Sequence, residues 1–440
     1  MSDFDLILVG SGPAAVATLL AAPAGMRTCV LTGDSARQPL PPQTPVHAKI
    51  RAVAYERRER PGIADVVPIA GSPKANFFET ATVGGLANYW GQQFVRYTSG
   101  DVWPRYIFDS FTSYVEACEQ VERIFVLSPD PAPANAPIGA GYVARTPRLL
   151  VGTPAQPHSG LLAMRTAFRE RLVGRSATAV IDARALSWSV ANDCVTVELD
   201  TGQRLRGSRL FLAAGVIGTL RLTLASCPQV SAIRFRDHAP KMLYTLGTDA
   251  ALRQTRADGL AHFNALSIER IEADCSTLFA SVYHMGRAEL SLLAAAIGLP
   301  PLLRGMRAPM AANLIKPIQV WTRNTHSEHR ISRHDVQAHT LANDEEGEDR
   351  ILNEFLDWLR SRRTLFKLTS SQPGGGFHFH AGTVEHSSGK ALAINDFLQS
   401  SSNGRVLCVD SSALSAIGCR PNALTAMSAT WALTKRALCN

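Results

Sequence analysis

Three stretches of the chain carry an apolar run, then glycines or other small residues, then a helical pattern. The first, FDLILVGSGPAAVATLLAA (4–22), places a buried strand from Leu6 to Val9 before a glycine turn and an alanine-rich helix. The second is an alternating meander (177–222), whose last strand meets a small-residue turn and a new helix. The third (404–438) is a strand, a small-residue loop and a long helix. Strands that alternate with helices in this way predict an α/β fold.

The middle of the chain has a different pattern. Residues 262–271 and 276–286 alternate apolar and polar positions, which is typical of strands with one buried face. Residues 343–363 begin with acidic residues and continue as an amphipathic pattern, which predicts a helix with a clear start. Strands followed by a helix, with no glycine motif, are typical of an α+β unit.

These patterns predict two domains. One is discontinuous and combines residues 1–235 with 375–440, and the other is an α+β substrate-binding domain over 236–374. The proline-rich segment 36–62 is predicted to be a loop or lid, and the proline-rich segment 127–141 a surface connection.

Composition excludes several functional classes. A chain of 440 residues, 46% hydrophobic and 19% charged, can bury a large core. The formal net charge is +8, but the basic clusters at 55–62 and 360–363 are short and lack regularly interleaved aromatic residues. We therefore expect a small-molecule substrate and no nucleic-acid partner.

Cysteine usage and hydropathy bear on location. The eight cysteines are scattered without a CxxC pair, which favours reduced, buried thiols in a cytoplasmic protein. The chain enters an apolar strand at residue 4, which leaves no room for a secretory signal. The most apolar segment, 288–315, is interrupted by glycine, proline and arginine, so no transmembrane segment is predicted. Its apolar character suits contact with a membrane surface or a hydrophobic substrate.

The glycine turn after the first strand carries the clearest chemistry. Gly10 permits a tight turn, Gly12 lets the backbone approach a pyrophosphate, and Ala15 lets the helix lie close to the strand. The helix amino terminus then presents free N–H groups and the positive end of its dipole to the phosphates. The next strand is expected to end in an acid that holds a ribose hydroxyl. Asp34 lies two residues beyond that strand end, so either it reaches back or the ribose contact is weaker.

Three further segments agree with a flavin site. The stretch TVGGLANYWGQQFVR (82–96) pairs glycines before a polar-aromatic run, AAG (213–215) opens a helix after a strand, and a strand at 404–410 ends in Asp410. With the amino-terminal turn, these four segments resemble the glucose-methanol-choline oxidoreductases of the compact bacterial type. The resemblance covers roughly half of the chain.

The resemblance implies a Rossmann-like FAD-binding domain, with the antiparallel sheet of the second domain roofing the flavin. It implies that bound FAD is contacted by Gly10, Gly12, Ala15, Asp34, Gly84, Gly85, Asn88, Trp90, Ala214, Gly215, Asp410, Ser411 and Asn422. Within that set, Asp410 is expected on the ribityl chain. No metal is implied, because no third ligand accompanies the histidine pair at a recognisable spacing.

Two histidines in GGGFHFHAGTVE (374–385) are the candidates for a catalytic base. In the resembled family a histidine beside the flavin takes the hydroxyl proton while the flavin takes hydride from the same carbon. Counting back from Gly382 puts Phe379 at the usual histidine position, with His378 and His380 on either side. The alternative is a polar strand face with no catalytic role.

The second catalytic position is also open. The asparagine–proline pair of the family is replaced by RPN (420–422), so either Arg420 or Asn422 occupies it. Arginine would favour an anionic substrate or anionic reduced flavin, whereas asparagine would orient a hydroxyl.

The sequence thus predicts an FAD-dependent oxidoreductase that oxidises an alcohol or related C–H centre, with a substrate that is hydrophobic, carrier-bound or a biosynthetic intermediate. The alternative is a flavin- or nucleotide-binding protein of this fold without redox turnover. Sequence does not distinguish an oxidase from a dehydrogenase or specify the oligomeric state.

Overall fold

The computed structural model describes residues 3–33, 65–68, 76–79, 83–128, 136–157, 163–173, 175, 177–238, 240–246, 264–283, 315–323, 327–332, 336–339, 345–370 and 378–439. The predicted loop 36–62, Asp34 and the apolar segment up to residue 314 lie outside the described residues. The chain is a mixed α/β protein, as predicted, and it contains several sheets.

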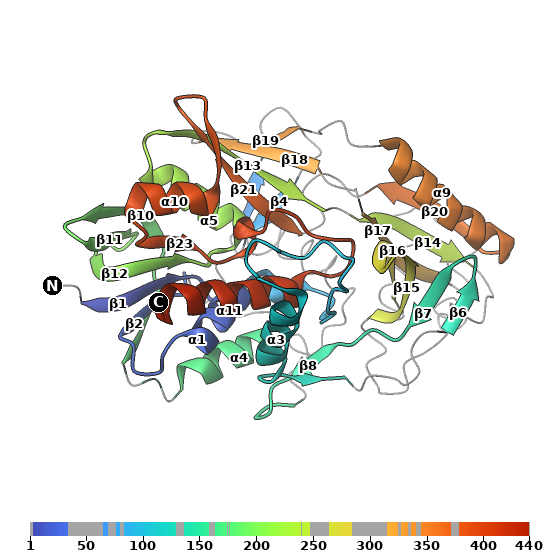
Figure 1. Ribbon diagram of the computed structural model, residues 1–440, viewed down its shortest axis with the longest axis horizontal. Coiled ribbons are helices and arrows are strands. Elements are labelled where there is room, and N and C mark those ends of the chain that lie inside the picture. The colour runs from blue at the N-terminus through green and yellow to red at the C-terminus, as the bar shows by residue number, and fades with distance from the viewer. Residues whose placement is uncertain are drawn as a thin grey trace, which may run out of the picture.

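A parallel sheet forms one half of the molecule, at the left of Figure 1. Its strands run in the order β23 (Val406–Cys408), β12 (Arg204–Leu212), β1 (Phe4–Val9), β2 (Thr28–Leu31) and β9 (Thr178–Ile181). The first half of β12 instead pairs antiparallel with β11 (Cys194–Leu199), which pairs with β10 (Ala185–Ala191). An early strand, β1, and a late strand, β23, therefore lie in one sheet on either side of β12.

Helices cover both faces of this sheet, so β1 is buried on both sides. Leu6 and Leu8 belong to a core with α1 (Pro13–Ala21), α3 (Phe111–Glu122), α4 (Ala163–Leu172) and α11 (Ala423–Cys439). Ile7 and Val9 belong to a second core with α5 (Gly215–Ser226) and α10 (Ile394–Ser402). Such continuous burial explains why the strand is an unbroken apolar run in sequence.

The other half is built around a seven-stranded antiparallel sheet. Its order is β20 (Leu365–Ser370), β14 (Lys241–Leu246), β17 (Ile315–Thr322), β16 (Cys275–Tyr283), β15 (Asn264–Glu272), β7 (Tyr142–Arg145) and β6 (Ala136–Gly139). Residues 136–139 are thus an edge strand rather than part of the surface connection predicted for 127–141. A proline is tolerated there, because Pro137 lies on a sheet edge.

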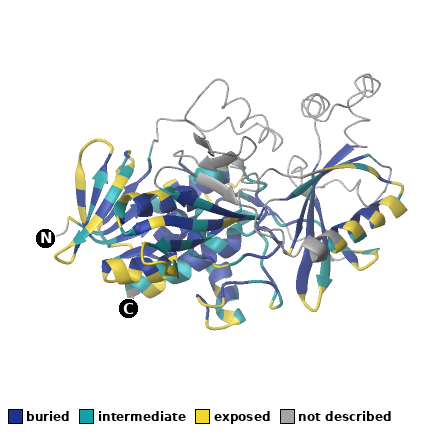
Figure 2. Cartoon of the chain, turned by 90° about the horizontal axis from the view of Figure 1, so that it is seen from above, coloured by how far each residue is buried: buried dark blue, intermediate teal, exposed yellow. Residues whose placement is uncertain are grey.

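Helix α9 (Glu345–Ser361) covers one face of the seven-stranded sheet, close to the predicted range of 343–363. Leu352, Phe355, Leu356 and Leu359 recur at helical spacing and pack into the core with Ile318 and Val320 of β17. The exposed residues of α9 lie on its outer side (Figure 2). The opposite face of the sheet is therefore turned toward the rest of the molecule.

A five-stranded antiparallel sheet lies beside α5 and α10. Its order is β19 (Val336–His339), β18 (Ser327–Ser332), β13 (Val230–Asp237), β21 (Phe379–His386) and β22 (Ala391–Ala393). In the described part of the chain, two short pairs complete the strands: β3 (Asp65–Pro68) with β4 (Asn76–Glu79), and β5 (Val126–Leu127) with β8 (Leu150–Gly152). Two 3₁₀ turns, η1 (Gly85–Tyr89) and η3 (Ser411–Ala413), follow candidate site segments.

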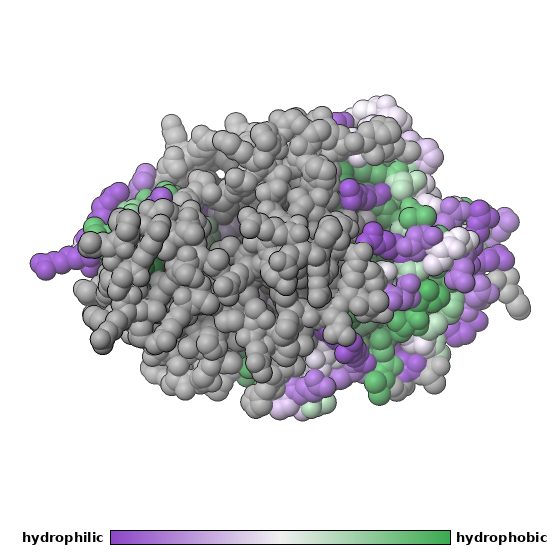
Figure 3. Space-filling model, turned by 180° about the vertical axis from the view of Figure 1, so that it is seen from behind, coloured by the Kyte–Doolittle hydropathy of each residue, from purple (hydrophilic) through white to green (hydrophobic). Residues whose placement is uncertain are grey.

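The described surface is mixed in character. On the back of the molecule, hydrophilic and apolar residues are interspersed among the coloured side chains (Figure 3). Within the described part of the chain, no helix is both long and apolar enough to cross a membrane.

Candidate functional site

Gly10 lies where the end of β1 touches the turn before α5. Its φ is +120°, and a Cβ at this position would lie 2.1 Å from the carbonyl oxygen of Ala213. The two segments are held together because the Ala213 N–H donates to the Val9 carbonyl at 2.8 Å. Only glycine fits such a backbone angle and such a close approach.

Gly12 is a different case. Its φ of −84° is open to any residue, and an added Cβ would come no closer than 3.8 Å to the carbonyl oxygen of Gly84 and Cα of Gly85. Protein packing therefore does not require glycine here. Gly12 caps α1 without a side chain, and the first turn of α1 has no acidic residue, so its N–H groups suit an anion.

The predicted segment 84–90 reaches the same place. Gly84 and Gly85 have φ of +96° and +60°, and the Gly84 N–H donates to the carbonyl of Ser11 at 3.1 Å. An added Cβ on Gly85 would lie 3.3 Å from Cα of Gly12. Three predicted segments, 10–12, 84–85 and 213–215, are therefore brought together.

The remaining predicted residues around this junction are placed as follows. Ala15 is fully buried in α1, Ala214 caps α5, and Gly215 begins α5 with φ of +74°. Trp90 lies edge-on to Phe94, with ring centroids 6.3 Å apart. The side chain of Asn88 lies outside what the structure describes.

A carboxylate that the sequence analysis missed lies at the end of β2. The hydroxyl of Thr32 donates to Oδ1 of Asp182 at 3.1 Å, and Asp182 is an exposed residue directly after β9. The sequence pattern predicted a ribose-binding acid at the end of β2 itself. The adjacency of β2 and β9, which are far apart in the chain, is what brings Asp182 to this position.

Asp410 is held entirely by protein groups. Its Oδ2 accepts from the hydroxyl of Thr219 on α5, while Oδ1 accepts from the N–H and the hydroxyl of Ser412 at 2.9 and 2.7 Å. Burial raises the pKa of this carboxyl, although the hydrogen bonds from Thr219 and Ser412 oppose the effect. Asp410 therefore fixes the turn that begins with Ser411, rather than offering a free carboxylate.

His380 lies at a distortion of β21. The pairing register with β13 shifts after His380, and Ala381 has a left-handed φ of +59°. A bulge of this kind re-aims the neighbouring side chain and is frequent next to active sites. Gly382 allows the bulge to pack tightly, because an added Cβ would lie 3.1 Å from Leu220 and 3.4 Å from Ser412. His380 is fully buried.

His378 has different surroundings. Its ring stacks on Trp321 of β17 at 5.4 Å and 15°, and its centroid lies 6.4 Å from that of the buried His238. Its carbonyl is 3.0 Å from Nδ1 of His380. His378 thus contacts the seven-stranded sheet, and His380 contacts the backbone of His378. No group of three or more residues suited to hold a metal occurs in the part of the chain that the structure describes.

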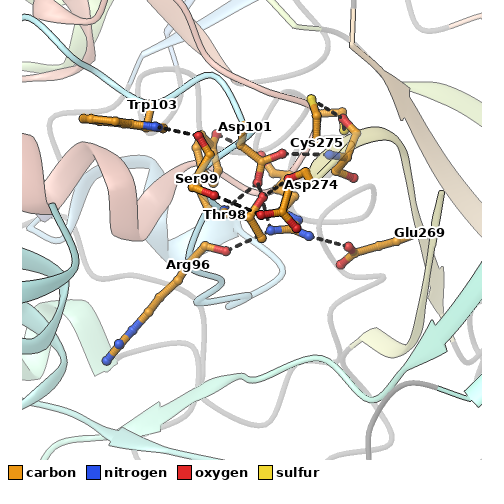
Figure 4. A network of polar contacts seen from close by, with 12 residues as sticks. Arg96, Thr98, Ser99, Asp101, Trp103, Glu269, Asp274 and Cys275 are labelled. Atoms are coloured by element: carbon orange, nitrogen blue, oxygen red, sulfur yellow. Dashed lines mark hydrogen bonds and ion pairs between the residues drawn. The ribbon is translucent and has the colours of Figure 1, made fainter. Parts of the chain in front are cut away.

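Arg420 forms a buried ionic network with Asp101 and Glu269, both of which are labelled in Figure 4. Its guanidinium donates to Asp101 and to Glu269 of β15, each at 2.8 Å, and all three side chains are at most 3% exposed. Burial lowers the pKa of this guanidinium, but the two carboxylates outweigh burial, so the pKa is raised. Its charge is already compensated within the protein.

Backbone contacts strengthen the same junction. The hydroxyl of Tyr97 donates to the Arg420 carbonyl at 3.2 Å, and the thiol of Cys419 donates to the Ser276 carbonyl at 3.0 Å. Asp101 also accepts from the Ser276 N–H at 2.8 Å. The loop before α11 is thereby fixed to the β15–β16 hairpin.

Asn422 follows this fixed loop directly. It is partly exposed, and its carbonyl accepts the first hydrogen bond of α11 from Ala426 at 2.8 Å. Of the two alternatives for the second catalytic position, the Arg420 side chain is held in ion pairs with two carboxylates, and Asn422 is the partly exposed residue.

A polar cluster joins the 91–93 segment to the seven-stranded sheet. Nε2 of Gln93 donates to the hydroxyl of Ser281 at 2.8 Å, and the Tyr283 hydroxyl donates to Gln319 at 2.8 Å. An added Cβ on Gly91 would lie 3.3 Å from the Tyr283 hydroxyl. Burial raises the pKa of Tyr283 to about 12, so this hydroxyl stays protonated at neutral pH.

The chain is similar in fold to the crystal structure of pyridoxine 4-oxidase from Mesorbium loti. The match covers 99% of this chain and 99% of that chain, with a TM-score of 0.50 and 12% sequence identity. At this identity the likeness concerns the fold alone. No family model matches the sequence, and no curated protein matches it.

Proposed function

We propose that the protein is an FAD-dependent oxidoreductase that oxidises an alcohol or a related C–H centre by hydride transfer to the flavin. The observation that carries the proposal is the contrast between Gly10, which protein packing requires, and Gly12, which it does not. A glycine without a packing reason, at the amino terminus of α1, fits the close approach of a dinucleotide pyrophosphate. The full-length likeness in fold to pyridoxine 4-oxidase agrees with this proposal.

The residues around the junction fit FAD. Gly12 and the first N–H groups of α1 would hold the pyrophosphate, and Gly84 and Gly85 would pack against it. The neighbouring carboxylate of Asp182 would accept from a ribose hydroxyl. FAD, when bound, supplies the hydride acceptor. The parallel sheet would then be part of a Rossmann-like FAD-binding domain.

His380 is the proposed base. When Nδ1 carries its proton and donates to the His378 carbonyl, the lone pair is on Nε2, which can accept the substrate hydroxyl proton. The bulge at Ala381 and the burial of His380 support a fixed orientation. Asn422 would orient the hydroxyl, and His378 would line the site through its contact with Trp321.

The proposed substrate is an uncharged hydrophobic or carrier-presented alcohol. Its support is the apolar segment 288–315 and the internal compensation of Arg420, which leaves that guanidinium no charge to offer an anion. Faster flavin reduction by simple hexoses than by lipophilic alcohols would contradict this substrate class.

The test of the proposed function is anaerobic flavin reduction by alcohols. Purified protein should be yellow and should bleach with a suitable alcohol. His380→Ala should lower the saturating rate of reduction by about 10²–10⁴-fold, because a positioned base is lost. His378→Ala should mainly alter affinity, and His386→Ala, at the other end of β21, should change neither. Yellow protein that no alcohol bleaches would indicate a flavin-binding protein without turnover.

A further inference from the structure

Gln92 combines two unfavourable features. It is 1% exposed, and its φ of +56° lies in the left-handed region that non-glycine residues seldom adopt. Its backbone is held there, since its carbonyl accepts from the Leu150 N–H at 2.8 Å. Strained residues of this kind cluster at functional sites.

The side chain of Gln92 adds a second cost. Its buried Nε2 has no hydrogen-bond partner among the described residues. The adjacent Gln93 is also buried, at 5% exposure, yet its Nε2 donates to Ser281. Leaving a buried amide donor unpaired is unfavourable. The presence of a glutamine at position 92 therefore needs an explanation other than packing within the protein.

The position of Gln92 indicates what the donor meets. Seven residues earlier in the chain, Gly85 packs against Gly12, which is the pyrophosphate end of the site. One residue before Gln92, Gly91 lies next to Tyr283 of the seven-stranded sheet. The segment therefore runs from the phosphates to the sheet. The isoalloxazine of a flavin, which lies beyond the pyrophosphate, would be met at the Gln92 end.

We propose that the Gln92 carboxamide donates a hydrogen bond to a carbonyl oxygen of the isoalloxazine. This inference rests on the proposed function. The pyrimidine carbonyls of a flavin are acceptors, and they become more negative when the ring is reduced. The Gln92 donor thus holds the oxidised flavin and stabilises the reduced flavin more strongly. It is a binding group that tunes the reduction potential.

The test uses Gln92→Met and the matched neighbour Gln93→Met in the full chain. After removal of flavin, Gln92→Met should melt at a higher temperature than the wild type, because an unpaired donor is gone. Gln93→Met should melt at a lower temperature, because its bond to Ser281 is lost. Titration with FAD should show about tenfold weaker binding for Gln92→Met, and its bound flavin should have a lower reduction potential.

The opposite results overturn the inference. A lower melting temperature for flavin-free Gln92→Met, with unchanged FAD affinity and potential, would make Gln92 a structural residue. Gln92→Asn is a second variant, since asparagine tolerates the left-handed backbone and withdraws the amide. It should also weaken FAD binding, and unchanged binding would count against the proposal. Wild-type protein that binds no FAD would instead refute the proposed function.

Discussion

Replacing Gly10 and Gly12 separately by alanine should have different consequences, although the two glycines are only two residues apart. At Gly10 the new Cβ would lie 2.1 Å from the Ala213 oxygen, whereas real Cβ atoms stay at least 3.0 Å away, so the segments must separate by 0.9 Å (3.0 − 2.1). Overpacking costs about 1–3 kcal/mol and a left-handed backbone about 1–3 kcal/mol. Gly10→Ala should therefore lose about 2–6 kcal/mol of unfolding free energy, a large share of a typical total.

At Gly12 the same methyl group meets only ordinary contacts at 3.8 Å. We expect Gly12→Ala to lose no more than about 1 kcal/mol, the usual cost of a poorer helix cap. The methyl group would instead occupy the space of the pyrophosphate and weaken a charge-assisted hydrogen bond of about 1.5–3 kcal/mol. FAD affinity should then fall roughly 10- to 150-fold.

Urea unfolding of the flavin-free proteins measures the first effect, and titration with FAD measures the second. Gly12→Ala should unfold near the wild-type midpoint and bind FAD weakly. Equal destabilisation of both variants, or wild-type FAD affinity in Gly12→Ala, would refute the assignment of Gly12 to the pyrophosphate.

Two further predictions concern buried charges. Arg420→Met should lower the unfolding free energy by about 3–5 kcal/mol, because the buried Asp101 and Glu269 lose the guanidinium, although Glu269 keeps Arg145 at 3.8 Å. Arg420→Lys should lose less, and equal losses in urea unfolding would contradict charge compensation. Burial lowers the pKa of Lys316 from 10.5 to about 8, so the unfolded state binds more protons between these values and wild-type stability rises with pH across that window. Lys316→Met should be more stable at pH 7 and lack this rise in thermal melts from pH 8 to 10.5; a rise that persists would assign it to another group.

Local patterns predicted most of the fold. The strand and helix around Gly10, the strands β15 and β16 and helix α9 all follow from short-range periodicity and were confirmed. Edge strand β6 was missed because its proline-rich sequence is also typical of a loop, and only its pairing with β7 makes it a strand.

The candidate site was less predictable because its side chains are placed by partners distant in sequence. Nothing near Arg420 in the chain indicates Asp101 or Glu269, which compensate its charge. Asp182 reaches Thr32 only because β2 and β9 are neighbours. The unpaired amide of Gln92 is a property of its surroundings, and no residue pattern encodes it.

The parallel sheet combines strands that are far apart in the chain, and this has a consequence for biosynthesis. A ribosome makes β1 and α1 long before β23, which pairs with β12, and α11, which shares a core with Ala15. During most of translation the nascent chain therefore exposes an unpaired strand edge and an uncovered apolar helix, both of which favour aggregation. Chains arrested before α11 should depend on chaperones and be degraded, rather than accumulate as partly active protein.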